Sequence, residues 1–175
     1  MEVLKLVTEV IDLRSFSNLW YWIALAVFWS SASHFVLGVP FDMVMRARRE
    51  GSEEAADLDV LAHIQIRRML RYVDQGGAYF VVVATFILSM LVTCAFYYQM
   101  EFAQAMFCLY FPLLIIIAIT VWSARKISRL EMTGPALHKQ LLVTRLIIQG
   151  LGILGILLTA LWGMYVSLTI GPVFK

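Results

Sequence analysis

Two apolar stretches that follow each other closely decide the fold of this chain. They are AYFVVVATFILSMLVTCAFYY at residues 78–98 and FAQAMFCLYFPLLIIIAITVWS at residues 102–123. Neither contains a charged side chain, and each reaches the roughly 20 residues that a helix needs to cross about 30 Å of hydrocarbon. Because only residues 99–101 separate them, we predict a tight antiparallel hairpin of two membrane-spanning helices.

Two further stretches meet the same requirement. They are FSNLWYWIALAVFWSSASHFVLG at residues 16–38 and LIIQGLGILGILLTALWGMYVSLTI at residues 146–170. Of the Asp, Glu, Lys, Arg and His residues, only His34 occurs in either stretch. Together the four stretches predict an all-α, polytopic membrane protein with four transmembrane helices in one membrane domain, residues 1–175.

The composition supports lipid as the main solvent. Hydrophobic residues make up 61% of the 175-residue chain and charged residues 15%, against roughly 45–50% and about 25% in soluble domains. A chain of this size exposes a large share of its surface, so it cannot hide this many apolar groups from water. The net charge of +2 is too small to indicate a nucleic-acid partner.

The N-terminal segment, MEVLKLVTEVIDLR at residues 1–14, is amphipathic. Its polar residues Glu2, Lys5, Glu9 and Asp12 recur at helical spacing, and apolar residues fill the remaining face. This pattern predicts a short helix lying in the membrane interface. A helix packed against a partner protein would show the same pattern.

The polar connection at residues 39–77 is long enough to contain a helix at about 53–73. Acidic residues cluster at its start and Arg67, Arg68 and Arg71 near its end, which suits the helix dipole. One face of this helix is apolar: Leu58, Leu61, Ala62, Ile66, Met69 and Val73. We predict a cytoplasmic amphipathic helix that lies flat under the membrane.

The three arginines of that helix have two interpretations. They could contact anionic lipid headgroups, at roughly 1 kcal/mol each. They could instead form part of a docking surface for a cytosolic or membrane protein. Both interpretations are compatible with the sequence.

The distribution of basic residues predicts the orientation. Residues 124–144 form a second, basic connection, and eleven of the fourteen lysines and arginines lie in or beside the two connections. Short basic loops stay on the cytoplasmic side. We therefore expect a multi-pass protein with both termini and the Glu101 hairpin outside the cytoplasm; in a bacterium this means the inner membrane, with these parts in the periplasm.

One polar cluster lies at membrane depth, in the stretch at 16–38. It comprises Ser30, Ser31, Ser33 and His34. An ionisable group inside a membrane indicates a functional site by default, although His34 is close enough to Gly38 to reach the inner headgroups. No oxyanion hole or orienting group accompanies the serines, so the cluster does not indicate a hydrolase.

The stretch at 146–170 carries small residues at every fourth position: Gly155, Thr159, Gly163 and Ser167. Such spacing lets helix backbones approach closely in lipid. We predict a helix-packing seam, which could serve the chain's own helices or another subunit. Cys94 and Cys108 have no histidine or carboxylate nearby in the sequence, so the sequence predicts no metal site, no cofactor and no catalytic group.

The run EVIDLRSFSNLWYWIALAVFWSSASHFVLGVPFDMVMRARR at residues 9–49, with EFAQA at 101–105, resembles a family of small inner-membrane proteins. The family belongs to alphaproteobacteria, especially the Rhodobacter and Roseobacter group, and is often labelled "component of SufBCD complex". The resemblance implies a link to iron–sulfur cluster assembly. Cluster chemistry needs exposed thiolates, and both cysteines here are predicted within spans, so the implied role is that of a membrane attachment point.

These observations favour a non-enzymatic accessory subunit, scaffold or assembly factor. Its expected partners are membrane lipids and other membrane or membrane-bound subunits, including a second copy of the chain. The alternative is a small oligomeric transporter or channel with a path lined by the serines and His34 of the stretch at 16–38.

Overall fold

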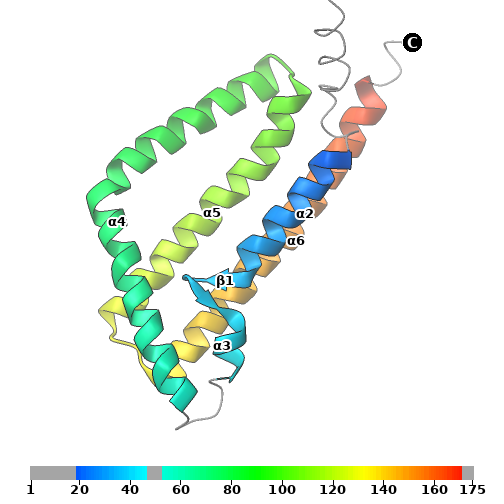
Figure 1. Ribbon diagram of the computed structural model, residues 1–175. Coiled ribbons are helices and arrows are strands. Elements are labelled where there is room, and N and C mark those ends of the chain that lie inside the picture. Colours follow the sequence, from blue (N-terminus) through cyan, green and yellow to red (C-terminus); the bar gives the residue numbers. More distant parts are fainter. Residues whose placement is uncertain (1–18, 47–52, 171–175) are drawn as a thin grey trace, which may run out of the picture.

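The computed structural model describes residues 19–46 and 53–170, and the predicted N-terminal interfacial helix at 1–14 lies outside them. The described part is helical apart from one very short ribbon and the short connections between elements. Its elements are α2 (Leu19–His34), β1 (Phe35–Val36), β2 (Val39–Pro40), α3 (Phe41–Arg46), α4 (Glu53–Val92), η2 (Thr93–Tyr97), α5 (Glu101–Arg129) and α6 (Gly134–Ile170). Figure 1 shows α4 and α5 forming a hairpin, with α2 alongside α6.

Three helices are long and apolar enough to span a membrane. The first is α4 with its extension η2, the second is α5 and the third is α6. The remaining predicted span, residues 16–38, is not one long helix in the structure. The helix α2 has 16 residues, about 24 Å of rise, which is less than the hydrocarbon thickness. After His34 the chain leaves the helix and forms an antiparallel ribbon, in which Phe35 pairs with Pro40 and Val36 with Val39.

The ribbon turns at two residues with left-handed backbone. Leu37 has φ 55° and Gly38 has φ 78°, and two consecutive positive φ values are typical of a two-residue hairpin turn of type I′. Glycine adopts this conformation readily, whereas leucine does so at a cost. The leucine side chain is nevertheless buried in a core cluster, which compensates for that cost. The sequence shows the glycine that favours a turn here, but it does not show that the Leu37 side chain is buried in the core.

The predicted boundary between the loop helix at 53–73 and the span at 78–98 is wrong. The helix α4 runs through it without a break, and the π-helix η2 extends it further. Gly76 and Gly77 keep helical backbone here, unlike Gly38 and Gly134, whose φ values are positive. A glycine weakens a helix by only about 1 kcal/mol relative to alanine, which strong helix formers on both sides outweigh. Figure 1 shows that α4 bends part-way along its length, and adjacent small residues are a known cause of such bends.

The second predicted connection, 124–144, is also mostly helical. The helix α5 continues to Arg129 and α6 begins at Gly134, so only residues 130–133 connect them. The amides of Leu130 and Met132 donate to the carbonyls of Lys126 and Ile127, at 3.1 and 3.2 Å. These bonds satisfy carbonyls at the end of α5 that would otherwise lack partners.

The polar ends of the three long helices pack together into a unit that we call the three-helix head. It consists of the first part of α4, the last part of α5 and the first part of α6. Its core is formed by Leu58, Ala62, Ile66, Ala124, Ile127, Leu137 and Leu141, with Leu37, Val39 and Val44 added from the ribbon and α3. The apolar face predicted for 53–73 is therefore covered by α5 and α6 and is not left open to the membrane surface, so the expectation of a helix lying flat is corrected.

A carboxylate on α4 caps the start of α6 in the head. The amide of Gly134, the first residue of α6, donates to Asp59 Oδ2 at 2.9 Å. The carboxylate supplies an acceptor to an amide that has no partner within its helix, and its charge is favourable at the positive end of the helix dipole.

Asp59→Ala should lower the free energy of unfolding by about 1 kcal/mol, because it removes this cap. Asp59→Asn should keep part of the stability through its amide oxygen. Thermal unfolding in detergent measures the effect, with Asp57→Ala as the matched control, since Asp57 is an exposed carboxylate on the same helix. Equal losses in the two alanine variants would contradict the capping role.

Candidate functional site

The predicted packing seam on α6 faces α2. Gly155, Thr159 and Gly163 are all buried. A Cβ atom at Gly155 would lie 3.0 Å from Trp29 Cζ2, and one at Gly152 would lie 3.1 Å from Trp29 Cε3. The indole of Trp29 thus occupies a notch that only glycines leave open. The seam serves the chain's own helices at this point, while the side chain of its last member, Ser167, is not described.

The polar cluster of α2 is only partly described. Ser30 and Ser31 are exposed, so in a bilayer they would face lipid or a neighbouring molecule. The side chains of Ser33 and His34 are not described, although their backbone forms the last turn of α2. A path lined by these residues stays a prediction.

The predicted arginine cluster lies on the outside of the three-helix head. Arg67, Arg68 and Arg71 are exposed on α4, and Arg67 Nε donates to the carbonyl of His63 at 3.3 Å. The fold also brings Arg125 of α5 to the same helix, 3.8 Å from Asp74. Both partners of that ion pair are more than half exposed, so it adds little stability, but it shows that two basic segments far apart in the sequence converge.

A buried polar network that the sequence did not reveal joins α5 to α6 inside the head. Ser123 Oγ lies 2.6 Å from Thr144 Oγ1, and Gln140 Nε2 donates to Ser123 Oγ at 3.1 Å. Lys126 Nζ donates to Gln140 Oε1 at 3.0 Å. Each bond pairs groups that would be costly to bury alone, so the network specifies how the two helices align.

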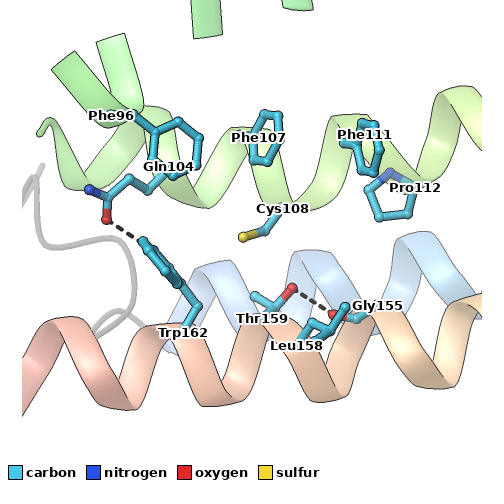
Figure 2. Close-up of a pocket in the computed structure, with 10 residues that line it drawn as sticks. All are labelled: Phe96, Gln104, Phe107, Cys108, Phe111, Pro112, Gly155, Leu158, Thr159 and Trp162. Carbon is cyan, nitrogen blue, oxygen red and sulfur yellow. Dashed lines mark hydrogen bonds between the residues drawn. The ribbon is translucent and has the colours of Figure 1, made fainter. Parts of the chain in front are cut away.

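An apolar cavity of about 290 Å³ lies between α5 and α6, and we call it the interhelical cavity. Figure 2 shows its lining. The lining residues are Phe96, Gln104, Phe107, Cys108, Phe111, Pro112, Gly155, Leu158, Thr159 and Trp162. Two of them, Gly155 and Thr159, belong to the predicted seam, and Gly155, which admits Trp29 on one side, also leaves space on another.

The π-helix η2 shapes one end of this cavity. The amide of Tyr98 donates to the carbonyl of Thr93 at 3.2 Å, and the amide of Met100 donates to that of Cys94 at 3.1 Å. The next carbonyl, of Ala95, accepts from Gln104 Nε2 at 3.0 Å. In lipid every backbone polar group needs an internal partner, and Gln104 supplies the one that the wider π turn requires.

The same glutamine binds α6. Its Oε1 accepts from Trp162 Nε1 at 3.1 Å, as Figure 2 shows, and the side chain is only 6% exposed. The side-chain amide of Gln104 therefore connects η2, α5 and α6, and both its nitrogen and its oxygen are hydrogen-bonded. Aromatic rings continue from this point: Phe96 meets both Phe107 and Trp162 edge to face, and Phe107 stacks on Phe111.

This cavity was not predicted from the sequence. A signal for it is present, since Phe107, Cys108 and Phe111 share one face of α5, and Gly155, Thr159 and Trp162 share one face of α6. Which faces meet, however, depends on helix packing. Cys94 and Cys108 are both free thiols, and across residues 19–46 and 53–170 no three His, Cys, Asp or Glu side chains gather as a metal site would need.

The protein is all-helical in its long elements, and the length and apolarity of three of its helices indicate the class of helical membrane proteins. Comparison with known proteins adds no relative: no family model matches the chain, and no curated protein or solved structure is significantly similar to it.

Proposed function

We propose that this protein is a non-enzymatic accessory subunit or scaffold of the bacterial inner membrane, whose three-helix head docks a protein partner on the cytoplasmic side. The head is the observation that carries the proposal. It extends the spans as a packed helical unit with its own hydrophobic core, and it presents Arg67, Arg68 and Arg71 on its exposed side.

The packing of the head favours docking over lipid contact as the role of these arginines. A helix that lies in a membrane interface buries its apolar face in the headgroup region. In the head, the apolar face of α4 is already buried against α5 and α6, with Leu58 and Ile66 each 1% exposed. The arginines are therefore held on a rigid helical support, a geometry suited to bidentate recognition of carboxylates on a partner.

The orientation in this proposal follows the basic residues. The head contains the convergent segments of α4 and α5 that carry Arg71 and Arg125, together with the basic start of α6. Basic segments flanking spans remain in the cytoplasm, which places the hairpin at Glu101 in the periplasm. The family resemblance makes the proteins of iron–sulfur cluster assembly the first partners to examine, with the chain acting as their membrane attachment point.

Replacing Arg67, Arg68 and Arg71 by lysine tests the proposal. Lysine keeps the charge that attracts lipid headgroups and sets topology, but it lacks the planar fork of the guanidinium. We expect the triple lysine variant to lose at least tenfold of the partner recovered by mild-detergent purification from native membranes, with membrane insertion unchanged.

The controls separate the two roles. Replacing only Lys139, an exposed basic residue on α6, by alanine should leave partner recovery within twofold of the wild type. A further variant replaces the same three arginines by glutamine, which removes their charge. If the triple lysine variant retains its partners while this glutamine variant loses affinity for anionic vesicles, the arginines bind lipid and docking through them is refuted. A chain that purifies from native membranes with no reproducible companion would refute the scaffold role itself.

A further inference from the structure

We propose that the interhelical cavity between α5 and α6 binds one acyl chain of a membrane lipid as an integral part of the protein. This site is independent of the three-helix head, so it goes beyond the docking function. The inference rests on where the cavity lies, which polar groups line it, and how its mouth is built.

The cavity lies within helices that are apolar enough to span a membrane. Three of its lining side chains reach the protein surface: Phe96 is 49% exposed, Phe111 is 44% exposed and Leu158 is 56% exposed. The surface around them is hydrocarbon when the helices span a bilayer. The cavity therefore opens toward lipid, and the molecules that meet its mouth are lipid chains.

The polar groups in the lining are engaged within the protein. Gln104 binds the Ala95 carbonyl and Trp162 through its amide nitrogen and oxygen. Thr159 Oγ1 donates to the carbonyl of Gly155 at 2.7 Å. A polar ligand would have to break these bonds in a medium that offers no replacement, and an apolar cavity does not hold water well. An alkyl chain forms no hydrogen bonds, so it can occupy the cavity without breaking these bonds.

The shape of the lining suits a chain rather than a compact ligand. From Gln104 to Pro112 the axis of α5 advances about 12 Å, and the lining residues of α6 from Gly155 to Trp162 face that length. Figure 2 shows Cys108 between the two helices, with its sulfur directed toward α6. Cys108 and Thr159 lie in the middle of the lining together with Phe107, while Phe96 and Trp162 lie toward one end and Phe111 and Pro112 toward the other.

A bound acyl chain would also supply packing contacts to the side chains that line the cavity. Without one, the side chains that line a void of about 290 Å³ lose dispersion contacts on one side. Protein interiors seldom leave such voids unfilled. A bound acyl chain restores those contacts and couples η2 and α5 to α6 near the hairpin at Glu101.

The test uses the full-length chain reconstituted in phosphatidylcholine vesicles that contain phospholipid with a diazirine in one acyl chain. The vesicles are dissolved in detergent with excess unlabelled lipid before illumination, so that loosely associated lipid is exchanged. Peptide mass spectrometry should then find the remaining labels on cavity residues such as Cys108 and Phe111. Met90, which is exposed on α4 and lies outside the cavity, should be labelled at least fivefold less.

The position of the diazirine sharpens the result. In the proposed orientation the chain enters near η2, so a group close to the headgroup should label the end at Phe96 and Trp162. A terminal group should label the end at Pro112 and Gly155. Identical label positions for both probes would show random contact and overturn the proposal.

Two matched variants exclude a general effect of mutation. Leu158→Trp plugs the mouth and should reduce cavity labelling at least fivefold. Leu157→Trp places the same ring on the neighbouring position, which is exposed to a similar degree but does not line the cavity, and should leave labelling unchanged. Phe107→Ala enlarges the cavity and should raise labelling if it folds, as judged by gel filtration.

Another result would refute the site. Equal labelling in the two tryptophan variants would do so, because a ring at the mouth would then not exclude the acyl chain from the cavity. Failure of these experiments would not affect partner recovery by the three-helix head, so the two proposals can fail separately.

Discussion

Ile66→Asp should unfold the three-helix head, with a loss of about 3–5 kcal/mol in the free energy of unfolding. Ile66 is 1% exposed, in a core shared by α4, α5 and α6. The substitution removes a large apolar side chain from a packed site and leaves a carboxylate without a partner in apolar surroundings. Few point substitutions combine both effects.

The matched variant is Ile64→Asp on the same helix. Ile64 is 48% exposed, so a carboxylate there keeps its contact with solvent and should change the stability by less than about 0.5 kcal/mol. Thermal unfolding of the two variants in the same detergent gives the comparison, and limited proteolysis between α5 and α6 reports on the head directly. If the helix lay flat on the membrane, Ile66→Asp would weaken surface contact but leave the unfolding temperature of the bundle nearly unchanged.

Gly155→Leu should separate α2 from α6. A Cβ atom at this position would already lie 3.0 Å from the indole of Trp29, closer than side-chain contacts ordinarily allow. The larger leucine must displace the ring or shift the helix, which costs about 1–3 kcal/mol where a site is well packed. The expected result is a lower unfolding temperature together with a red-shifted, more quenchable tryptophan fluorescence.

Gly150→Ala is the control for this prediction. Nothing lies within 4 Å of a Cβ atom at Gly150, and alanine favours the helix over glycine by roughly 0.5–1 kcal/mol. The variant should therefore be as stable as the wild type or more stable. Restoration of the Gly155→Leu protein by Trp29→Ala would confirm that the two side chains compete for one space. A stable Gly155→Leu protein with unchanged fluorescence would contradict the notch.

The residues of the packing seam on α6 and of the apolar face on α4 could be predicted from the sequence, but the helices that pack against them could not. The seam residues Gly155 and Thr159 follow from their spacing, and the apolar face containing Leu58 and Ile66 follows from helical periodicity. The partners of those faces did not follow. Periodicity shows that a face is apolar and says nothing about whether lipid, another helix or a second chain covers it.

Helix boundaries were the weakest part of the prediction for a related reason. Polar and charged residues after Trp122 and before Leu146 end the apolar stretches, and the predicted helices were ended at the same places. In the structure α5 and α6 continue beyond the apolar stretches, because a helix can continue when a partner covers its apolar face. In the head, α4, α5 and α6 provide that partner for each other.

The sequence alone determined that this chain carries long uncharged apolar runs suited to lipid and that these runs favour helices. An uncharged run of about 20 residues has no other stable partner for its side chains, and within hydrocarbon only a helix satisfies its backbone groups locally. The tertiary structure alone decided the three-helix head, the notch for Trp29 and the interhelical cavity. Each depends on contacts between distant residues, such as Asp59 with Gly134 and Gln104 with Trp162, and such contacts leave no periodic trace in the sequence.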